Sequence, residues 1–225
     1  MPKIRAVLFD LDGTLTNTLD DLAASVNFAL STHGFPVHEV PAYRYFVGNG
    51  AAVMIRRALP ESARDEETVA RLLETFMAHY SVHSQDKTGP YDGVEALVAA
   101  LRARGYRTAV VTNKPDSAAQ DIVASMFPGL FDAVIGQREG VPTKPDPAMP
   151  RLAMAALRVA PEECVFLGDS NVDILTGAGC GAFPVGVLWG FRDREELMEA
   201  GARELIARPD ELWRVLDRLN GEDGR

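Results

Sequence analysis

Two carboxylates spaced two residues apart follow the first apolar segment of the chain. Residues 4–9 are apolar except for Arg5, and the sequence continues as Asp10-Leu11-Asp12-Gly13-Thr14. A short apolar run of this kind is typical of a strand buried on both faces within a parallel sheet. Two ionised carboxylates this close repel each other unless they share a proton or a cation lies between them. The pattern therefore indicates a metal site or a proton-sharing pair, and an ordinary Asp-Gly turn is the alternative interpretation.

Polar residues also follow later strand-like or loop segments of the chain. Thr112-Asn113 ends a run rich in β-branched residues, and Asp169 follows the apolar residues 165–168. Between them, Lys144 lies just before a helix that Pro147 is expected to open. In open α/β sheets, ligands bind outside the carboxyl ends of the strands, so these side chains are expected to meet at one edge.

Each of these signals also has a purely structural interpretation. Thr112-Asn113 could cap the following helix, and Lys144 could be a solvated surface residue. Asp169 and Asp173 could stabilise the first turn of a helix through its dipole. The joint occurrence of all the strand-end signals in order favours the catalytic interpretation.

The combined set has the composition of a phosphoryl-transfer site. Asp10 can attack phosphorus and form an aspartyl-phosphate, while Asp12 is placed to protonate the leaving oxygen and then to deprotonate a water. An anionic nucleophile that meets a phosphate needs counter-charge, which Lys144 and a metal ion would provide. Thr112 and Asn113 are the further phosphate-binding candidates.

A hard cation such as Mg²⁺ prefers oxygen ligands. The predicted metal ligands are Asp10, Asp12 and Asp169. Asp173 is expected to orient a metal-bound water or Lys144 without itself being a ligand.

Composition limits the class of protein. The 225 residues are 47% hydrophobic and carry a net charge of −9, and no basic stripe that would indicate nucleic-acid binding is present. No apolar run approaches the roughly 20 residues that a membrane span requires, and no signal-peptide pattern is visible. Two cysteines lack metal-ligand spacing, so a reduced, cytoplasmic setting is expected.

The elements that must position these residues fall into two groups. Apolar spacing predicts only helices between residues 16 and 88, including 49–59 and 66–82. From residue 89 onward, strands alternate with helices, which predicts a parallel sheet with right-handed crossovers. We therefore expect an α/β core of residues 1–15 and 89–225 with an all-helical cap, 16–88, inserted into it. The expected core strands are 4–9, 107–112, 131–136, 165–168, 183–188 and a short edge strand at 203–206, and the expected core helices are 93–103, 115–126, 147–157, 172–177 and 210–219. Residues 221–225 are expected to form a frayed tail.

The four segments resemble the four motifs of the haloacid dehalogenase-like superfamily of hydrolases. These are Asp10-Leu11-Asp12-Gly13-Thr14, Thr112-Asn113, Lys144-Pro145, and Gly168-Asp169-Ser170 with Asp173. The resemblance implies a Rossmann-like core, Mg²⁺ and an aspartyl-phosphate route. The position of the helical insert resembles the branch that contains phosphoglycolate phosphatases and β-phosphoglucomutases. The dehalogenases lack an acid at the position of Asp12, which points to phosphate esters.

The resemblance extends to one loop of the predicted cap. Gly48, Asn49 and Gly50 precede a helix that carries Arg56 and Arg57, and such a loop can bind an anion with backbone N–H groups. The expected substrate contacts are Gly48, Asn49, Gly50 and Arg56, since two adjacent arginines cannot face the same direction on a helix. A loop that simply joins two helices is an equally good interpretation.

The sequence thus predicts a Mg²⁺-dependent phosphatase of small phosphorylated metabolites, similar to phosphoglycolate phosphatases, as a monomer or homodimer. The first alternative is a phosphosugar mutase of the β-phosphoglucomutase type. The second is a non-catalytic binding protein on the same fold, which would have no use for a paired nucleophile and acid.

Overall fold

The computed structural model describes residues 3–221. Its centre is a six-stranded sheet in the order β5-β4-β1-β6-β7-β8, and every neighbouring pair is parallel. The strands are β1 (Ala6–Phe9), β4 (Arg107–Pro115), β5 (Ala133–Gln137), β6 (Cys164–Gly168), β7 (Phe183–Val187) and β8 (Glu204–Ile206). The predicted α/β class is confirmed.

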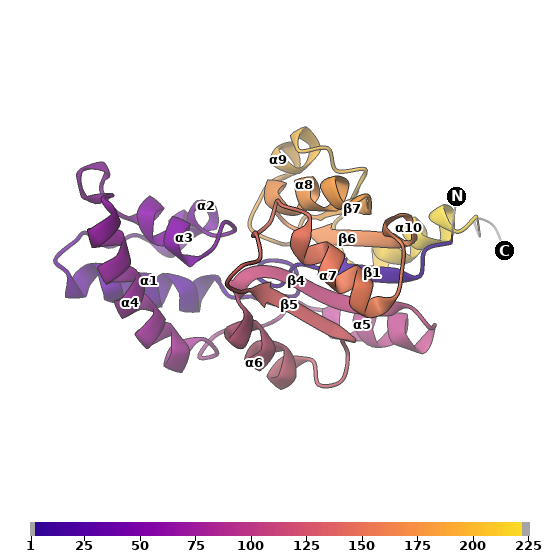
Figure 1. Cartoon of the computed structure of the whole chain (residues 1–225), viewed down its shortest axis with the longest axis horizontal. Helices are drawn as coiled ribbons and strands as arrows, with labels where there is room; N and C mark the ends of the chain where they lie inside the picture. The colour runs from indigo at the N-terminus through magenta and orange to yellow at the C-terminus, as the bar shows by residue number, and fades with distance from the viewer. Residues whose placement is uncertain (1–2, 222–225) are drawn as a thin grey trace.

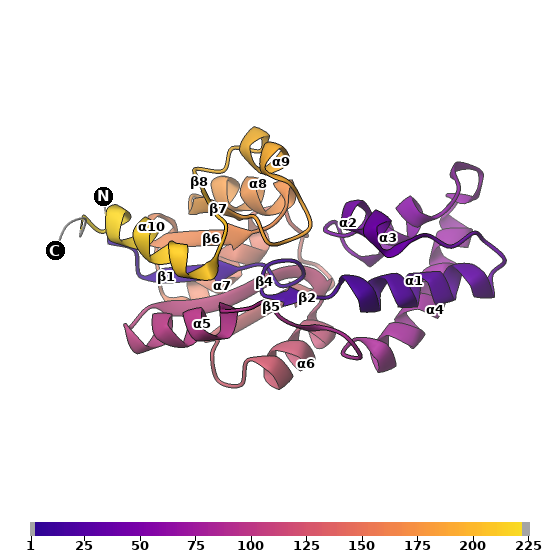
Figure 2. The same cartoon turned by 180° about the vertical axis from the view of Figure 1, so that it is seen from behind.

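Helices cover both faces of this sheet (Figures 1 and 2). They are α5 (Val94–Ala103), α6 (Asp116–Met126), α7 (Ala148–Leu157), α8 (Asn171–Cys180), α9 (Arg194–Glu199) and α10 (Leu212–Leu219). Alternate residues of β1 point to opposite faces: Val7 and Phe9 belong to the apolar cluster with α5 and α10, whereas Leu8 belongs to the cluster with α7. Burial on both faces explains why β1 reads as a continuous apolar run.

A second group of helices lies beyond the carboxyl ends of the strands (Figure 1). It contains α1 (Leu19–Thr32), α2 (Tyr43–Phe46), α3 (Ala51–Ala58) and α4 (Glu66–His83). These helices enclose an apolar cluster of their own, in which Leu30, Ile55 and Leu72 are fully buried. We call this group the helical lobe. None of the helices in residues 3–221 is both long enough and apolar enough to cross a membrane.

The structure differs from the predicted elements at several points. Residues 16–88 were expected to be helical throughout, but β2 (Thr16–Asn17) pairs antiparallel with β3 (Gly89–Pro90) where the chain passes between the sheet and the helical lobe. A two-residue strand is too short to show alternation in sequence. Helix α9 was not predicted, α8 is longer than expected, and β4 continues past Thr112 through an irregularity to Pro115. Residues 222–225 of the expected frayed tail lie outside the described residues.

Candidate active site

The carboxyl edge of the sheet brings the predicted residues together beneath the helical lobe. Asp10 directly follows β1, Thr112 and Asn113 lie within β4, and Asp169 follows β6. Lys144 comes from the loop between β5 and α7, and Asp173 lies in the first turn of α8. These residues are far apart in the sequence, but they meet at one edge of the sheet because the carboxyl ends of parallel strands lie at the same edge.

A buried lysine joins two of the carboxylates. The Nζ of Lys144 donates to Asp10 Oδ1 at 2.7 Å and to Asp173 Oδ1 at 2.7 Å. The side chain of Lys144 is 2% exposed, so its charge acts in a medium of low dielectric. Asp173 also closes the first turn of α8, because its Oδ2 accepts from the N–H and the hydroxyl of Ser170. Asp173 thus acts both as a helix cap and as a partner of Lys144.

Asp169 is fixed from two directions. Its Oδ2 accepts from the backbone N–H of Phe191 at 2.8 Å, and its Oδ1 accepts from the hydroxyl of Thr14 at 3.3 Å. The chain passes so close to this carboxylate that a Cβ at Gly13 or Gly190 would overlap Asp169. Glycine is therefore required at both positions by close approach rather than by turn geometry alone.

Three carboxylates converge in this buried space. Asp10, Asp169 and Asp173 each offer an oxygen that lies within 4.8 Å of the other two. Burial and the charge of Asp173 raise the pKa of Asp10 to about 7, even though Lys144 opposes both effects. Burial and the neighbouring Asp173 and Asp10 likewise hold the pKa of Asp169 well above its usual value.

The donor set fits a hard divalent cation. The cluster holds three carboxylates, and Lys144 supplies one positive charge in contact with two of them. Oxygen ligands in a buried site with excess negative charge suit Mg²⁺, which is bound through one or two carboxylates together with waters and substrate oxygens.

The carboxylate of Asp12 is not part of this cluster. It forms an ion pair with Lys114, whose Nζ lies 2.9 Å from Oδ1 and 3.0 Å from Oδ2. The Asp12 carboxylate is thus held by Lys114, while Asp173 lies with Asp10 and Asp169 in the carboxylate cluster, and the ligand set of Asp10, Asp12 and Asp169 stays a prediction. The sequence analysis did not single out Lys114. Its position directly after Thr112-Asn113 at a strand end is the signal that could have identified it.

The two polar residues of β4 have different surroundings. Asn113 pairs with the backbone of Lys144: its Oδ1 accepts from the N–H at 2.8 Å, and its Nδ2 donates to the carbonyl at 3.0 Å. The same Nδ2 donates to the carbonyl of Gly48 in the helical lobe at 3.1 Å. The side chain of Asn113 is therefore engaged in positioning Lys144. Thr112 is buried, and its hydroxyl accepts from the N–H of Lys114.

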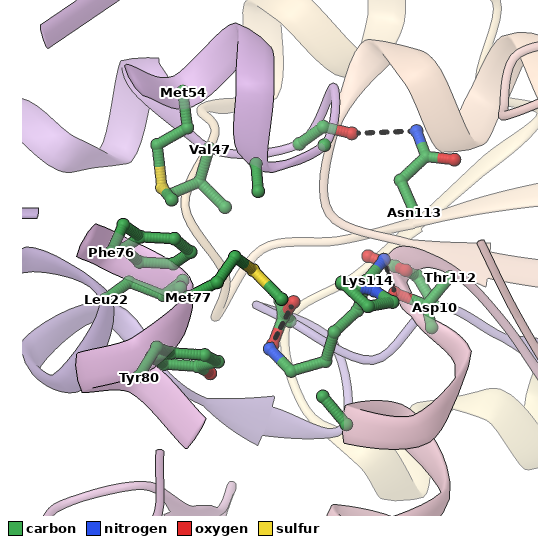
Figure 3. Close-up of a pocket in the computed structure, with 16 residues that line it drawn as sticks. Asp10, Leu22, Val47, Met54, Phe76, Met77, Tyr80, Thr112, Asn113 and Lys114 are labelled. Carbon is green, nitrogen blue, oxygen red and sulfur yellow. Dashed lines mark hydrogen bonds and ion pairs between the residues drawn. The ribbon is translucent and has the colours of Figure 1, made fainter. Parts of the chain in front are cut away.

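A pocket opens between the sheet edge and the helical lobe (Figure 3). The sheet contributes mostly polar residues to its lining, and the helical lobe contributes mostly apolar ones. The lining residues are Asp10, Asp12, Leu22, Val47, Gly48, Gly50, Ala51, Met54, Phe76, Met77, Tyr80, Thr112, Asn113, Lys114, Pro115 and Ala118. The nucleophile candidate and the acid candidate therefore face one space.

Two of the four predicted contacts in the helical lobe line this pocket. Gly48 and Gly50 do, and Gly50 precedes the first residue of α3 with a φ of 87°. Arg56 does not: it donates to the carbonyl of Arg64 and pairs with Glu66 at 2.9 Å. The side chain of Asn49 accepts from Arg57 at 2.8 Å, which fixes the loop from within.

A segment after β7 connects the carboxylate cluster to the helical lobe. The backbone N–H of Phe191 holds Asp169, while the Phe191 ring is buried in the apolar cluster of the lobe. The next residue, Arg192, donates through Nη2 to the carbonyl of Val47 at 2.9 Å. Sequence analysis missed this segment because no polar residue marks the end of β7.

This chain is similar to known proteins in sequence and in fold. Residues 4–181 match the haloacid dehalogenase-like hydrolase family. A phosphoglycolate phosphatase of Cereibacter sphaeroides is 38% identical over 217 residues, which cover 95% of this chain and 98% of that protein. The phosphoglycolate phosphatase of Colwellia psychrerythraea is 36% identical over 201 residues, covering 87% of this chain and 89% of that one.

A solved structure agrees over the full length. A protein of Lactobacillus delbrueckii subsp. bulgaricus, given the provisional name phosphoglycolate phosphatase, superposes with a TM-score of 0.91 at 33% identity. The match covers 98% of this chain and 100% of that chain. The resemblance that the four motifs predict is thus confirmed along almost the whole sequence, and this chain belongs to the haloacid dehalogenase-like family of hydrolases.

Proposed function

We propose that this protein is a Mg²⁺-dependent phosphatase that hydrolyses small phosphorylated metabolites, phosphoglycolate first among them. The observation that carries the proposal is the position of Asp10. It is a buried carboxylate that is held by Lys144, faces the pocket and lies near Asp12 and its partner Lys114. The relatives named for phosphoglycolate hydrolysis support the choice of substrate.

In the proposed reaction, a carboxylate oxygen of Asp10 attacks phosphorus and the ester P–O bond breaks. Asp12 gives its proton to the departing oxygen, so the alcohol leaves as a neutral group. Asp12 then takes a proton from a water, the water oxygen attacks the phosphorus of the aspartyl-phosphate, and inorganic phosphate and Asp10 are released.

Lys144 and the acidic cluster balance charge during both steps. Lys144 favours the anionic form of Asp10 and supplies positive charge near the phosphate, while Asn113 and Asp173 hold Lys144 in place. Mg²⁺ held by Asp10 and Asp169, with Asp173 beside them, would neutralise phosphate charge that repels the nucleophile. Thr112 is the proposed hydroxyl contact to the phosphate.

The proposed cap is residues 16–88, which contain the helical lobe. It closes one side of the pocket with apolar residues and so limits the access of bulk water to the aspartyl-phosphate. Two contacts to the sheet edge hold it: Asn113 to the carbonyl of Gly48, and Arg192 to the carbonyl of Val47.

Phosphate release from phosphoglycolate and from p-nitrophenyl phosphate tests this proposal. We expect turnover of both that requires Mg²⁺, is lost with a chelator and returns when Mg²⁺ is restored. The Asp10→Asn variant should lose at least about 10³-fold in kcat, because a missing nucleophile removes the covalent route. Asp116→Asn, the same substitution at an acidic residue that does not line the pocket, serves as the control. Equal rates for Asp10→Asn and wild type would contradict the proposal.

The same assay separates hydrolysis from the mutase alternative. With β-glucose 1-phosphate as substrate, a ³¹P spectrum distinguishes inorganic phosphate from an isomerised sugar phosphate. We expect inorganic phosphate. Isomerised sugar phosphate as the main product would replace the phosphatase proposal by the mutase.

A further inference from the structure

A tyrosine hydroxyl in the pocket is left without a hydrogen-bond partner. Tyr80 is 4% exposed, and its hydroxyl accepts or donates no hydrogen bond of normal geometry within the described residues. Its ring stacks on Phe76 at 5.2 Å and anchors the side chain to α4. Buried hydroxyl groups almost always have a partner, so this hydroxyl at a pocket wall is available to a bound water or to a polar atom of a substrate.

A buried ammonium group lies beside this hydroxyl. Lys114 Nζ is 4.9 Å from the centroid of the Tyr80 ring, and Figure 3 shows the two side chains pointing toward one another from opposite lobes. Burial raises the pKa of Tyr80, and both the charge of Lys114 and its close approach to the Tyr80 hydroxyl oppose that effect. Lys114 has three N–H donors and pairs with one carboxylate, that of Asp12.

The remaining wall of the helical lobe offers little polarity. Its side chains include Leu22, Val47, Met54, Phe76 and Met77. Within the described residues that line the pocket, Lys114 is the only cationic side chain. An anionic group on a leaving alcohol therefore has one cation to approach, and the orphaned hydroxyl lies next to it.

We propose that Lys114 and Tyr80 form a carboxylate-binding subsite that selects phosphate esters of short hydroxy acids. The substrate carboxylate would accept one hydrogen bond from the ammonium and one from the hydroxyl, which gives the Tyr80 hydroxyl its missing partner. Asp12 lies between the reacting phosphate and this subsite because it protonates the ester oxygen and contacts Lys114. The carboxylate should therefore be only one or two carbons from the ester oxygen.

This inference rests on the proposed phosphatase function, which it deepens by assigning the side chains that bind the substrate carboxylate. It assigns no substrate contact to Arg56, because the Arg56 guanidinium is bound to the carbonyl of Arg64 and the carboxylate of Glu66. It also assigns Tyr80 a role in binding in addition to its packing against Phe76.

The test compares two esters that differ only at the recognised group. Phosphoglycolate carries a carboxylate, and 2-hydroxyethyl phosphate carries a neutral CH₂OH in its place. Values of kcat and KM are measured for both esters with wild type, Tyr80→Phe and Lys114→Met. Tyr45→Phe, which alters an exposed tyrosine, is the matched control, and thermal unfolding verifies that each variant is folded.

We expect Tyr80→Phe to lower kcat/KM for phosphoglycolate about 10-fold, mainly through KM, with little change for 2-hydroxyethyl phosphate. Lys114→Met should lower both, because Asp12 loses its partner, but phosphoglycolate about 10- to 100-fold more than the neutral ester. Preference for phosphoglycolate would thus collapse in both variants. If each variant changes the two esters equally, or if wild type shows no preference, the subsite is wrong.

A binding measurement separates failure of the subsite from failure of the proposed function. Phosphoglycolate is titrated calorimetrically, in Mg²⁺, into the Asp10→Asn protein with and without Tyr80→Phe. About 10-fold weaker binding with Tyr80→Phe supports the subsite even if wild type hydrolyses no ester, in which case only the phosphatase proposal falls. Unchanged or absent binding of phosphoglycolate overturns the subsite even when p-nitrophenyl phosphate is turned over.

Discussion

Asp10 illustrates the conflict between burial and charge at a nucleophile. A carboxylate that attacks phosphorus must be anionic, yet burial in a space with Asp169 and Asp173 favours its protonated form. The pKa of about 7 that results for Asp10 shows that the single charge of Lys144 does not offset these effects. A cation in the cluster would resolve the conflict, because it stabilises the ionised form of each carboxylate.

The raised pKa predicts how stability depends on pH. An acid whose pKa is higher in the folded than in the unfolded protein binds its proton more tightly when folded. The contribution of Asp10 is therefore most favourable below about pH 4 and is lost as pH rises toward 7. Between pH 5 and 7.5, the metal-free wild type should lose more stability than Asp10→Asn in urea unfolding. An identical pH slope for the two proteins would contradict this.

Mg²⁺ binding should show the opposite trend. The cation competes with protons for Asp10 and Asp169, so its affinity should increase with pH up to about 7. Saturating Mg²⁺ should raise the melting temperature more at pH 7.5 than at pH 5.5, because ligands that bind only the folded state stabilise it. Asp10→Asn should show a smaller increment at both values. An increment that falls with rising pH would be inconsistent with carboxylate ligands.

At the residue scale, the sequence was informative where position alone determines chemistry. Asp10, Lys144 and Asp169 lie at strand ends or in loops at the same sheet edge, and parallel topology brings those ends together whatever the side chains are. The partner of each side chain was not predictable. The ion pair of Asp12 with Lys114 depends on rotamers and burial that a residue pattern does not encode.

At the scale of elements, the segment after β7 links two functions. Phe191 donates its N–H to Asp169 and inserts its ring into the helical lobe, and Arg192 reaches the carbonyl of Val47. Arg192 also pairs with Glu196 in α9, which limits the movement of its side chain. A displacement of the helical lobe would therefore move Phe191, whose N–H contacts the acidic cluster.

Removal of the Arg192 side chain should loosen the loop before α3. In Arg192→Ala the Val47 carbonyl loses a charged donor, a contact worth about 1.5–3 kcal/mol. Amide hydrogen exchange over residues 47–50 should become faster, and KM for phosphoglycolate should rise several-fold. Arg208→Ala, at an exposed arginine paired with Asp210, is the control and should change neither. Unchanged exchange in Arg192→Ala would show that the link does not restrain the loop.

The elements themselves were predictable in proportion to their length and regularity. Helix α4 was expected at 66–82 and spans Glu66–His83, because its apolar residues recur at helical spacing over several turns. Helix α9 has only six residues and lies beside the segment that holds Asp169. Six residues are too few to show helical periodicity, and the remaining sequence signal was the N-cap Asp193, whose side chain accepts from the N–H of Glu196.

At the scale of the whole molecule, the chain crosses between the sheet and the helical lobe twice. The crossings are paired where β2 meets β3, and Asp21 in the first turn of α1 ties them together. Its carboxylate accepts from the N–H of Lys87 and from both the N–H, at 2.8 Å, and the hydroxyl, at 2.7 Å, of Thr88. Asp21 is buried, so water cannot take the place of its carboxylate as the acceptor for these donors.

Asp21 should therefore determine how firmly the two lobes are joined. Asp21→Ala leaves the donors of Lys87 and Thr88 unpaired and should lower the free energy of unfolding by about 2 kcal/mol, measured in urea. Because the lobe then loses one of its attachments, kcat/KM for phosphoglycolate should fall about 10-fold, whereas p-nitrophenyl phosphate, which makes no use of the carboxylate subsite, should be less affected. Asp20→Ala removes a partly exposed carboxylate from the same helical turn and keeps every one of these hydrogen bonds, so it isolates the attachment from the helix dipole. If Asp20→Ala and Asp21→Ala behave alike, the dipole rather than the attachment explains the effect, and the two crossings do not act as a joint.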